Sequence, residues 1–77
     1  MKRYYIDELD GDALREAIEE TAEFNGIEVE DWFAEVDGIM AIASDMNYVF
    51  NENGEKLDYH NGKYMTSYEY AMAKAGA

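Results

Sequence analysis

The residues of this chain that come nearest to a chemical motif are the acids and amides around two glycines, in the segments DELDGD and NENGE. A calcium-binding EF-hand loop needs oxygen-bearing side chains at its positions 1, 3 and 5, glycine at 6 and glutamate at 12. With Gly11 at position 6, Ile6 takes position 1. With Gly54 there, Val49 takes position 1. Neither segment fits the loop, so we expect no metal site and interpret these carboxylates as solvated.

The remaining chemical groups do not form a catalytic set. The chain has one histidine, His60, and no cysteine, whereas a zinc site needs three or four strong ligands in fixed geometry. No G-x-S-x-G segment and no glycine-rich phosphate-binding loop is present. The hydroxyl groups besides tyrosine belong to Thr21, Ser44, Thr66 and Ser67. We therefore expect a protein that is not an enzyme and that binds no cofactor.

Charge is the property in which the chain departs most from an ordinary small domain. Eighteen acids face six bases, and the formal net charge is −12. A field of this sign repels nucleic acid and anionic membranes and attracts basic proteins. We expect the partner to be a basic nucleic-acid-binding protein, with no direct contact between this chain and nucleic acid or membrane.

The length and the apolar content place the chain in one small domain, residues 1–77. No segment approaches the roughly 18–20 apolar residues of a membrane span. The first twelve residues, MKRYYIDELDGD, lack the apolar region of a signal peptide. We expect a cytoplasmic location, in the host cell if the protein is encoded by a phage.

The densest acidic stretch is EAIEETAEFNGIEVEDWFAE, residues 16–35, which holds eight acids and no base. At 100° per residue, four acids of the first predicted helix fall within about 60° of one another. Three more form a similar cluster on the second predicted helix. We predict that these seven carboxylates bind the partner: Asp12, Glu16, Glu19, Glu23, Glu28, Asp31 and Glu35.

Few basic residues in the sequence can neutralise these carboxylates. Arg15 is the only base on the first predicted helix, where it can pair with Glu19 or with Asp12. No base occurs from residue 16 to residue 55. Like charges four residues apart destabilise a helix by about 0.2–0.5 kcal/mol per pair. The absence of interleaved lysines favours a binding role for the acids over a merely solubilising one.

The first helix is predicted to begin at Asp10 or Asp12, either of which can cap it, and to run to about Phe24. Asn25-Gly26 then supplies a C-terminal stop. Apolar and small residues recur at the three- and four-residue spacing of a buried helical face: Leu14, Ala17, Ile18, Thr21 and Phe24.

A second, shorter helix is predicted over residues 28–36, with Val29, Trp32, Phe33 and Val36 on one face. Glycine inside a helix costs about 1 kcal/mol relative to alanine. Ile42 would also point away from the apolar face of a longer helix. We therefore predict that the helix ends at Asp37 and that IMAIA, residues 39–43, forms a buried strand.

Two other interpretations of this segment remain open. In one, the helix continues through Gly38 to Ala43. In the other, Asp37-Gly38 is the turn of a hairpin; we rank it last, since few positions around it alternate.

The other segments predict short strands joined by tight turns. KRYYI, within Met1–Leu9, predicts a short strand or an extended lead-in. YVFN, KLDYH and KYM follow as strands, with turns at Asn53-Gly54 and Asn61-Gly62. Thr66 or Ser67 can cap a last helix, SYEYAMAKA. The fold class is therefore α+β, with two N-terminal helices, a small antiparallel β-meander and a C-terminal helix.

The predicted core collects the apolar members of the periodic segments: Trp32 with Leu14, Ile18, Val36, Ile39 and Phe50. The chain also has seven tyrosines. We expect most of them at the edge of the core, with the ring inward and the hydroxyl group in water.

In size, charge and lack of cysteine, and in its carboxylate-dense segments ALREAIEETAEF and VEDWFAEVD, the chain resembles small phage-encoded anti-defence proteins. These include anti-CRISPR and anti-restriction proteins, several of which are DNA mimics. The resemblance covers the whole chain in character, without a shared motif. It implies a non-enzymatic inhibitor of a bacterial defence protein. The alternatives are an immunity or antitoxin-like protein that neutralises a basic toxin, and a small phage accessory or structural protein.

Overall fold

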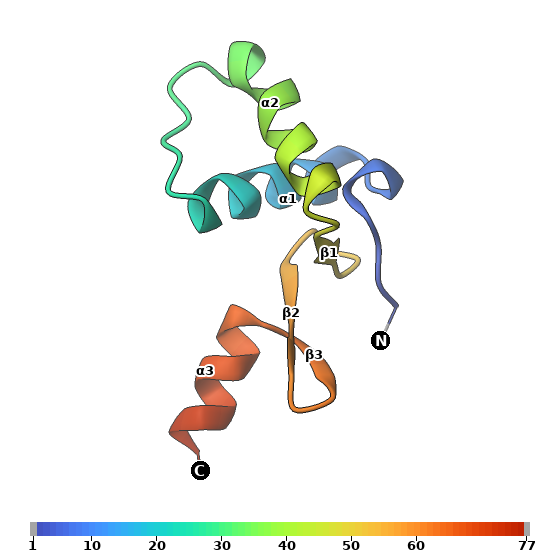
Figure 1. The fold of residues 1–77 in the computed structure, drawn as a ribbon, viewed down its shortest axis with the longest axis vertical. Helices are drawn as coiled ribbons and strands as arrows, with labels where there is room; N and C mark the ends of the chain where they lie inside the picture. Colours follow the sequence, from blue (N-terminus) through green and yellow to red (C-terminus); the bar gives the residue numbers. More distant parts are fainter. Residues whose placement is uncertain (1, 77) are drawn as a thin grey trace.

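The structure, a computed structural model, describes residues 2–76 and has an α+β fold. A short 3-10 turn (Ile6–Glu8) precedes α1 (Gly11–Phe24) and α2 (Trp32–Asp45); then come β1 (Val49–Phe50), β2 (Lys56–His60), β3 (Lys63–Thr66) and α3 (Ser67–Ala75). The strands form one antiparallel sheet in the order β1-β2-β3. The predicted class is confirmed: two N-terminal helices, a β-meander and a C-terminal helix (Figure 1).

Helix α1 follows the prediction closely. Ala17, Ile18 and Thr21 are buried at the predicted spacing. The helix ends where Gly26 adopts a φ of +68°, a conformation that glycine reaches without strain. Asp10 occupies the N-cap position, although its side chain accepts no capping hydrogen bond. Phe24 is an exception to the predicted apolar face, because its side chain is 60% exposed.

Helix α2 corrects the prediction for residues 39–43, which are helical and not a strand. Ile39 and Ala43 lie one turn apart and are both buried against α1 and the rest of the core. Gly38 faces solvent, and glycine at this helical position costs about 1 kcal/mol. The burial of Ile39 and Ala43, which follow it in the helix, offsets this cost. Ile42, which the prediction placed away from the apolar face of such a helix, is half-buried.

The start of α2 also differs from the prediction, because the helix begins at Trp32 and not at residue 28. Residues 25–31 form the connection from α1. Phe33 was placed on the apolar face, yet its side chain is 91% exposed. A helix that starts four residues later and runs on to Asp45 buries a face centred on Ile39 and Ala43, and Phe33 lies at its margin.

The N-terminal lead-in joins the sheet through one residue. Tyr4 pairs antiparallel with Phe50, and each N–H donates to the other residue's carbonyl oxygen at 2.8 Å. Ile6 then packs into the core from the 3-10 turn. The predicted strand or extended lead-in is thus a single bridge followed by a turn; Met1 lies outside the described residues.

The hydrophobic core lies among the 3-10 turn, α1, α2 and β1. Of the predicted core, Ile18, Ile39 and Phe50 are buried. Three predicted members are half-buried and pack against these residues: Leu14, Trp32 and Val36. We call residues 2–55, which contain this core, the acidic body.

The C-terminal part, residues 56–76, extends away from α1 and α2 (Figure 1), and we call it the hairpin arm. The molecule is elongated as a result, with extents of 42 × 23 × 21 Å. Asn61 (φ 49°) and Gly62 (φ 82°) form the left-handed turn between β2 and β3 that their Asn-Gly sequence predicts. A capping box between Thr66 and Glu69 starts α3.

Lys56 joins the arm to the body and is buried, with 7% of its surface exposed. Its backbone N–H donates to Glu20 Oε1 of α1 at 2.7 Å. Its Nζ forms an ion pair with Asp58 and lies 4.0 Å from the ring centroid of Phe24 and 4.6 Å from that of Tyr48. The positive charge of Lys56 is therefore paired with Asp58 inside the fold and is hardly exposed to solvent.

Candidate partner-binding surface

Four predicted carboxylates form a ridge along the outer side of α1. We call Asp12, Glu16, Glu19 and Glu23 the acidic ridge. By helix geometry its centre lies about 180° around the axis from the buried residues Ile18 and Thr21. Asp12, Glu19 and Glu23 are exposed and Glu16 is half-buried. The fold therefore presents the ridge to solvent along the whole of α1.

The ridge is scarcely neutralised by the rest of the protein. Arg15 Nε lies 3.4 Å from Glu19 Oε1, and both side chains are at least half exposed. An ion pair of this kind contributes at most about 1 kcal/mol. Within residues 2–76, neither Asp12, Glu16 nor Glu23 forms an ion pair.

Glu16 is the ridge residue most affected by its surroundings. Burial, and then the charges of Glu20, Glu19, Glu55 and Glu23, raise the pKa of its carboxyl group above the usual 4.5. Crowding by like charges thus has an energetic cost in the folded state. The sequence analysis did not identify Glu20 and Glu55 as neighbours of the ridge.

The loop between β1 and β2 carries Glu55 to α1. Gly54 in this loop is buried with a φ of +84°, and an added Cβ would lie only 2.0 Å from the carbonyl oxygen of Ala13. Glycine is therefore required for this close approach of loop to helix. A contact between segments about forty residues apart leaves no periodic signal in the sequence, which explains why Glu55 was missed.

The second predicted acidic cluster does not exist as a face of a helix. Glu28 lies in the connection before α2. Asp31 is the N-cap of α2, and its side chain accepts a hydrogen bond from the Ala34 N–H at 3.4 Å. Glu35 Oε2 accepts from the backbone N–H groups of Glu30 (2.9 Å) and Asp31 (2.8 Å). Asp31 and Glu35 therefore hold the start of the helix, while Glu28 stays exposed and is not aligned with them.

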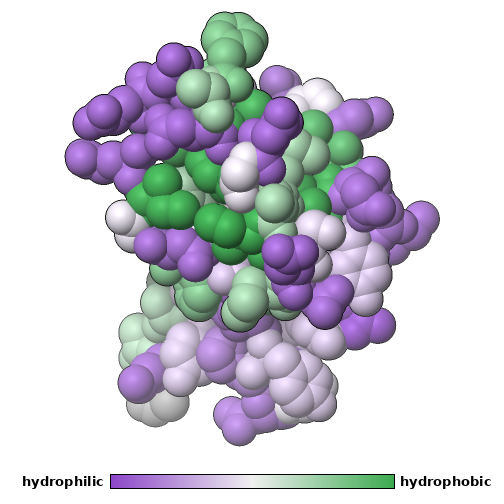
Figure 2. All heavy atoms as spheres, turned by 45° about the horizontal axis from the view of Figure 1, so that its top comes forward, coloured by the Kyte–Doolittle hydropathy of each residue, from purple (hydrophilic) through white to green (hydrophobic). Residues whose placement is uncertain are grey.

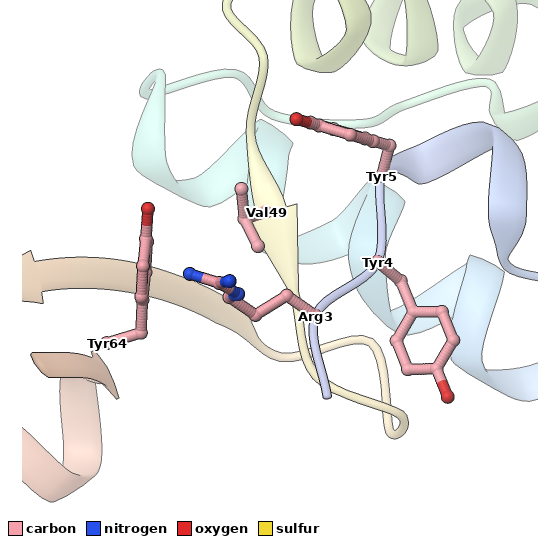
Figure 3. A pocket seen from close by; sticks show the side chains of 5 residues that line it. All are labelled: Arg3, Tyr4, Tyr5, Val49 and Tyr64. Carbon is pink, nitrogen blue, oxygen red and sulfur yellow. The ribbon is translucent and has the colours of Figure 1, made fainter. Parts of the chain in front are cut away.

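A hollow of about 340 Å³ lies between the N-terminal lead-in, β1 and β3 (Figure 3). Its lining consists of Arg3, Tyr4, Tyr5, Val49 and Tyr64. The Arg3 guanidinium points toward the ring of Tyr64, 4.6 Å from its centroid, whereas the Tyr4 side chain points away. The lining thus combines one guanidinium group with three tyrosine side chains.

Metal-binding geometry is not found in the described part of the chain, where no three histidine, cysteine or acidic side chains converge on one point. The imidazole of His60 stacks on the ring of Tyr70, with centroids 3.9 Å apart. None of the helices within residues 2–76 is long and apolar enough to cross a bilayer.

Four of the seven tyrosines are exposed, against the prediction that most lie at the edge of the core: Tyr68 (71%), Tyr59 (65%), Tyr5 (54%) and Tyr70 (37%). Tyr4, Tyr48 and Tyr64 are half-buried, as expected at the edge of the core.

No protein-family model, no curated protein and no solved structure matches this chain.

Proposed function

We propose that this protein is a non-enzymatic inhibitor that binds a basic, nucleic-acid-handling protein of bacterial defence, such as a CRISPR effector or a restriction nuclease. The observation that carries the proposal is the acidic ridge, a solvent-facing row of carboxylates on a rigid helix with only one ion pair. In this proposal the ridge occupies a cleft lined by lysine and arginine and excludes DNA or RNA from it. The inhibitor acts in the bacterial cytoplasm, where such proteins meet their substrates.

The spacing of the ridge supports mimicry of a phosphate backbone. Its four carboxylates are distributed over eleven residue steps, or about 16 Å of helix, which gives about one charge per 5 Å. One strand of DNA carries a phosphate about every 3.4 Å of axis. The two charge densities are of the same order, so a cleft that holds phosphates attracts the ridge as well.

The distribution of charge over the molecule supports the same proposal. Sixteen of the eighteen acids and three of the six bases belong to residues 1–55, which carry a net charge of −13. Residues 56–77 carry +1. Such an asymmetry orients the molecule as it approaches a basic surface, so that the body and not the arm meets the partner first.

The proposal is tested by removing ridge charge without changing shape. The triple variant Glu16→Gln, Glu19→Gln and Glu23→Gln keeps side-chain volume and helix propensity. The matched control removes three exposed charges elsewhere, through Asp7→Asn, Asp45→Asn and Glu52→Gln. The partner is first isolated on immobilised protein from a bacterial lysate at low and at high salt, and affinities are then measured with that purified partner.

We expect the ridge variant to bind more weakly than the control, in part through slower association. Wild-type binding should weaken as salt rises, and the partner's nucleic acid should compete with it. Equal affinities of the two variants, or a ternary complex with nucleic acid bound, would contradict the proposal. Recovery of a basic toxin as the partner would instead favour an immunity or antitoxin-like role.

A further inference from the structure

Among residues 2–76, Phe33 is the large apolar side chain with the greatest exposure, 91%, and it lies in the first turn of α2. Val36 and Met40 follow it at three and seven residues, a spacing that aligns side chains along one side of a helix. Both are half-buried and pack against the core. An apolar strip therefore leads from the core of the protein out to an uncovered phenylalanine.

The neighbouring outer face of α2 carries several small residues together with the exposed Asp37 and Asp45. Ala34, Gly38 and Ala41 are exposed there, and a Cβ added at Gly38 would meet no atom within 4 Å. The small residues leave this side of the helix accessible, and Asp37 places a negative charge beside Phe33. Exposed aromatic side chains that fill a pocket of the partner are common anchors of protein interfaces.

Acids flank Phe33 in the sequence. Glu28, Glu30 and Asp31 precede it, Asp37 follows one helical turn later, all four are exposed, and no base occurs from residue 16 to residue 55. Figure 2 turns the α2 end of the molecule forward and shows hydrophobic side chains exposed in the middle and at the top of the view, among hydrophilic ones. Apolar patches with a polar rim mark protein-interaction sites, and here the rim is negative.

The start of α2 lies next to the acidic ridge. The guanidinium of Arg15 lies between the two, with Nε 3.4 Å from Glu19 Oε1 and the group 5.2 Å from the ring centroid of Trp32. Trp32 immediately precedes Phe33 in the chain. One partner surface can therefore cover the ridge and the strip together.

We propose that Phe33 is the apolar anchor of the interface and that the occupant is a protein with a hydrophobic pocket bordered by lysine and arginine. Charge complementarity selects this occupant. A second copy of the chain would bring the same acidic rim against itself, and nucleic acid would be repelled by it. This inference rests on the proposed function for the ridge, although the two make separable contributions to binding.

The test uses two synthetic helix-forming peptides with equal numbers of lysines. One has leucines along one face, and the other has glutamine in place of each leucine. Their affinities for the full chain are measured at low and at raised salt, with emission of Trp32, the single tryptophan, as a second readout. The variants are Phe33→Ser and Phe33→Leu, and Tyr59→Ser serves as the control, since Tyr59 is 65% exposed on the hairpin arm.

We expect wild type to bind the leucine peptide at least about tenfold more tightly than the glutamine peptide. Phe33→Ser should lose most of that preference and Phe33→Leu should keep most of it, while Tyr59→Ser should leave it unchanged. Trp32 emission should shift with the leucine peptide only. The preference should persist at raised salt, because apolar contact is not screened.

Phe33 would be excluded as the anchor if Phe33→Ser kept the preference, or if Tyr59→Ser removed it equally. A wild-type dimer that Phe33→Ser converts to monomer in sedimentation would make a second copy the occupant and overturn the inference. The ridge variant separates the two proposals. It should weaken binding of both peptides by the same factor, and if it weakens neither, the ridge proposal fails while the result for Phe33 stands.

Discussion

The acidic body and the hairpin arm are stabilised in different ways. All seven residues of the buried core cluster lie in the body, between Ile6 and Phe50. Beyond Leu57, the arm buries only Thr66, and α3 has no buried residue. The arm instead uses local interactions: an Asn-Gly turn, an edge-to-face pair of Tyr59 and Tyr64, and a helix cap. Where the chain has a packed core it can carry a dense surface charge, and the arm, which lacks one, is close to neutral.

The largest expected effect comes from the core. Phe50 is fully buried, and Phe50→Ala should lower the free energy of unfolding by about 3–5 kcal/mol, enough to unfold much of a domain this small. Tyr68→Ala on the exposed side of α3 should change it by less than about 0.5 kcal/mol. Urea denaturation followed by Trp32 emission measures both. Similar losses for the two variants would remove the distinction between body and arm.

A smaller effect is expected from the cap of α3. Thr66→Ala removes the hydroxyl group that accepts the Glu69 N–H at 3.1 Å, which should cost about 1 kcal/mol. The loss of stability should be confined to the arm, because the main packing contacts of α3 are with β2 and β3. Amide hydrogen exchange should quicken in α3 and stay unchanged in α1, with Thr66→Ser as the control that retains the hydroxyl. Faster exchange throughout α1 would show that arm and body unfold together.

The smallest effect concerns Glu16 and pH. Its pKa is raised in the folded state, so the native protein binds that proton more tightly than the unfolded chain does. The associated stability is fully present below the unfolded value of 4.5 and is lost as pH rises through the raised pKa. Glu16→Gln should therefore melt higher than wild type at pH 8, by about 0.2–0.5 kcal/mol in stability, and the difference should vanish near pH 4.

Thermal melts of both proteins across this pH range measure the effect, and Glu52→Gln controls for the loss of one exposed charge. Added salt at pH 8 should narrow the gap between Glu16→Gln and wild type, because it screens the neighbouring carboxylates. A gap that is constant with pH would mean that ionisation of Glu16 is not its source.

Local signals in the sequence were sufficient for the arm and for α1. Asn61-Gly62 and the Thr66–Glu69 pair each determine the backbone over a few residues, and both were predicted correctly. Helix α2 was not, because the cost of Gly38 is local whereas the burial of Ile39 and Ala43 that offsets it depends on α1. The packing of α2 against α1 decides that residues 39–43 are helical, and the periodicity of the sequence does not reveal this packing.

The candidate surface was predictable in part for the same reason. The ridge follows from helix geometry alone, so its four residues were aligned as predicted. Binding by Asp31 and Glu35 stays a prediction, and the structure adds that both side chains stabilise the start of α2, which the spacing of the acids did not indicate. The exposure of Phe33 depends on where α2 starts, and the proximity of Glu55 to Glu16 depends on the loop at Gly54.

The burial of Lys56 has a consequence for proteolysis. Trypsin cleaves after lysine and arginine, and Lys56 is the only such residue between Arg15 and Lys63. With that side chain enclosed by Phe24, Tyr48 and Asp58, the protease finds no accessible site from residue 16 to residue 62, which spans α2, β1 and β2. Limited digestion of the native protein should therefore leave the bond after Lys56 intact, so that residues 16–63 stay together in one fragment. Exhaustive digestion of the denatured chain should release residues 16–56 as a single long acidic peptide, so glutamate-specific cleavage is the better choice for detecting this protein by mass spectrometry.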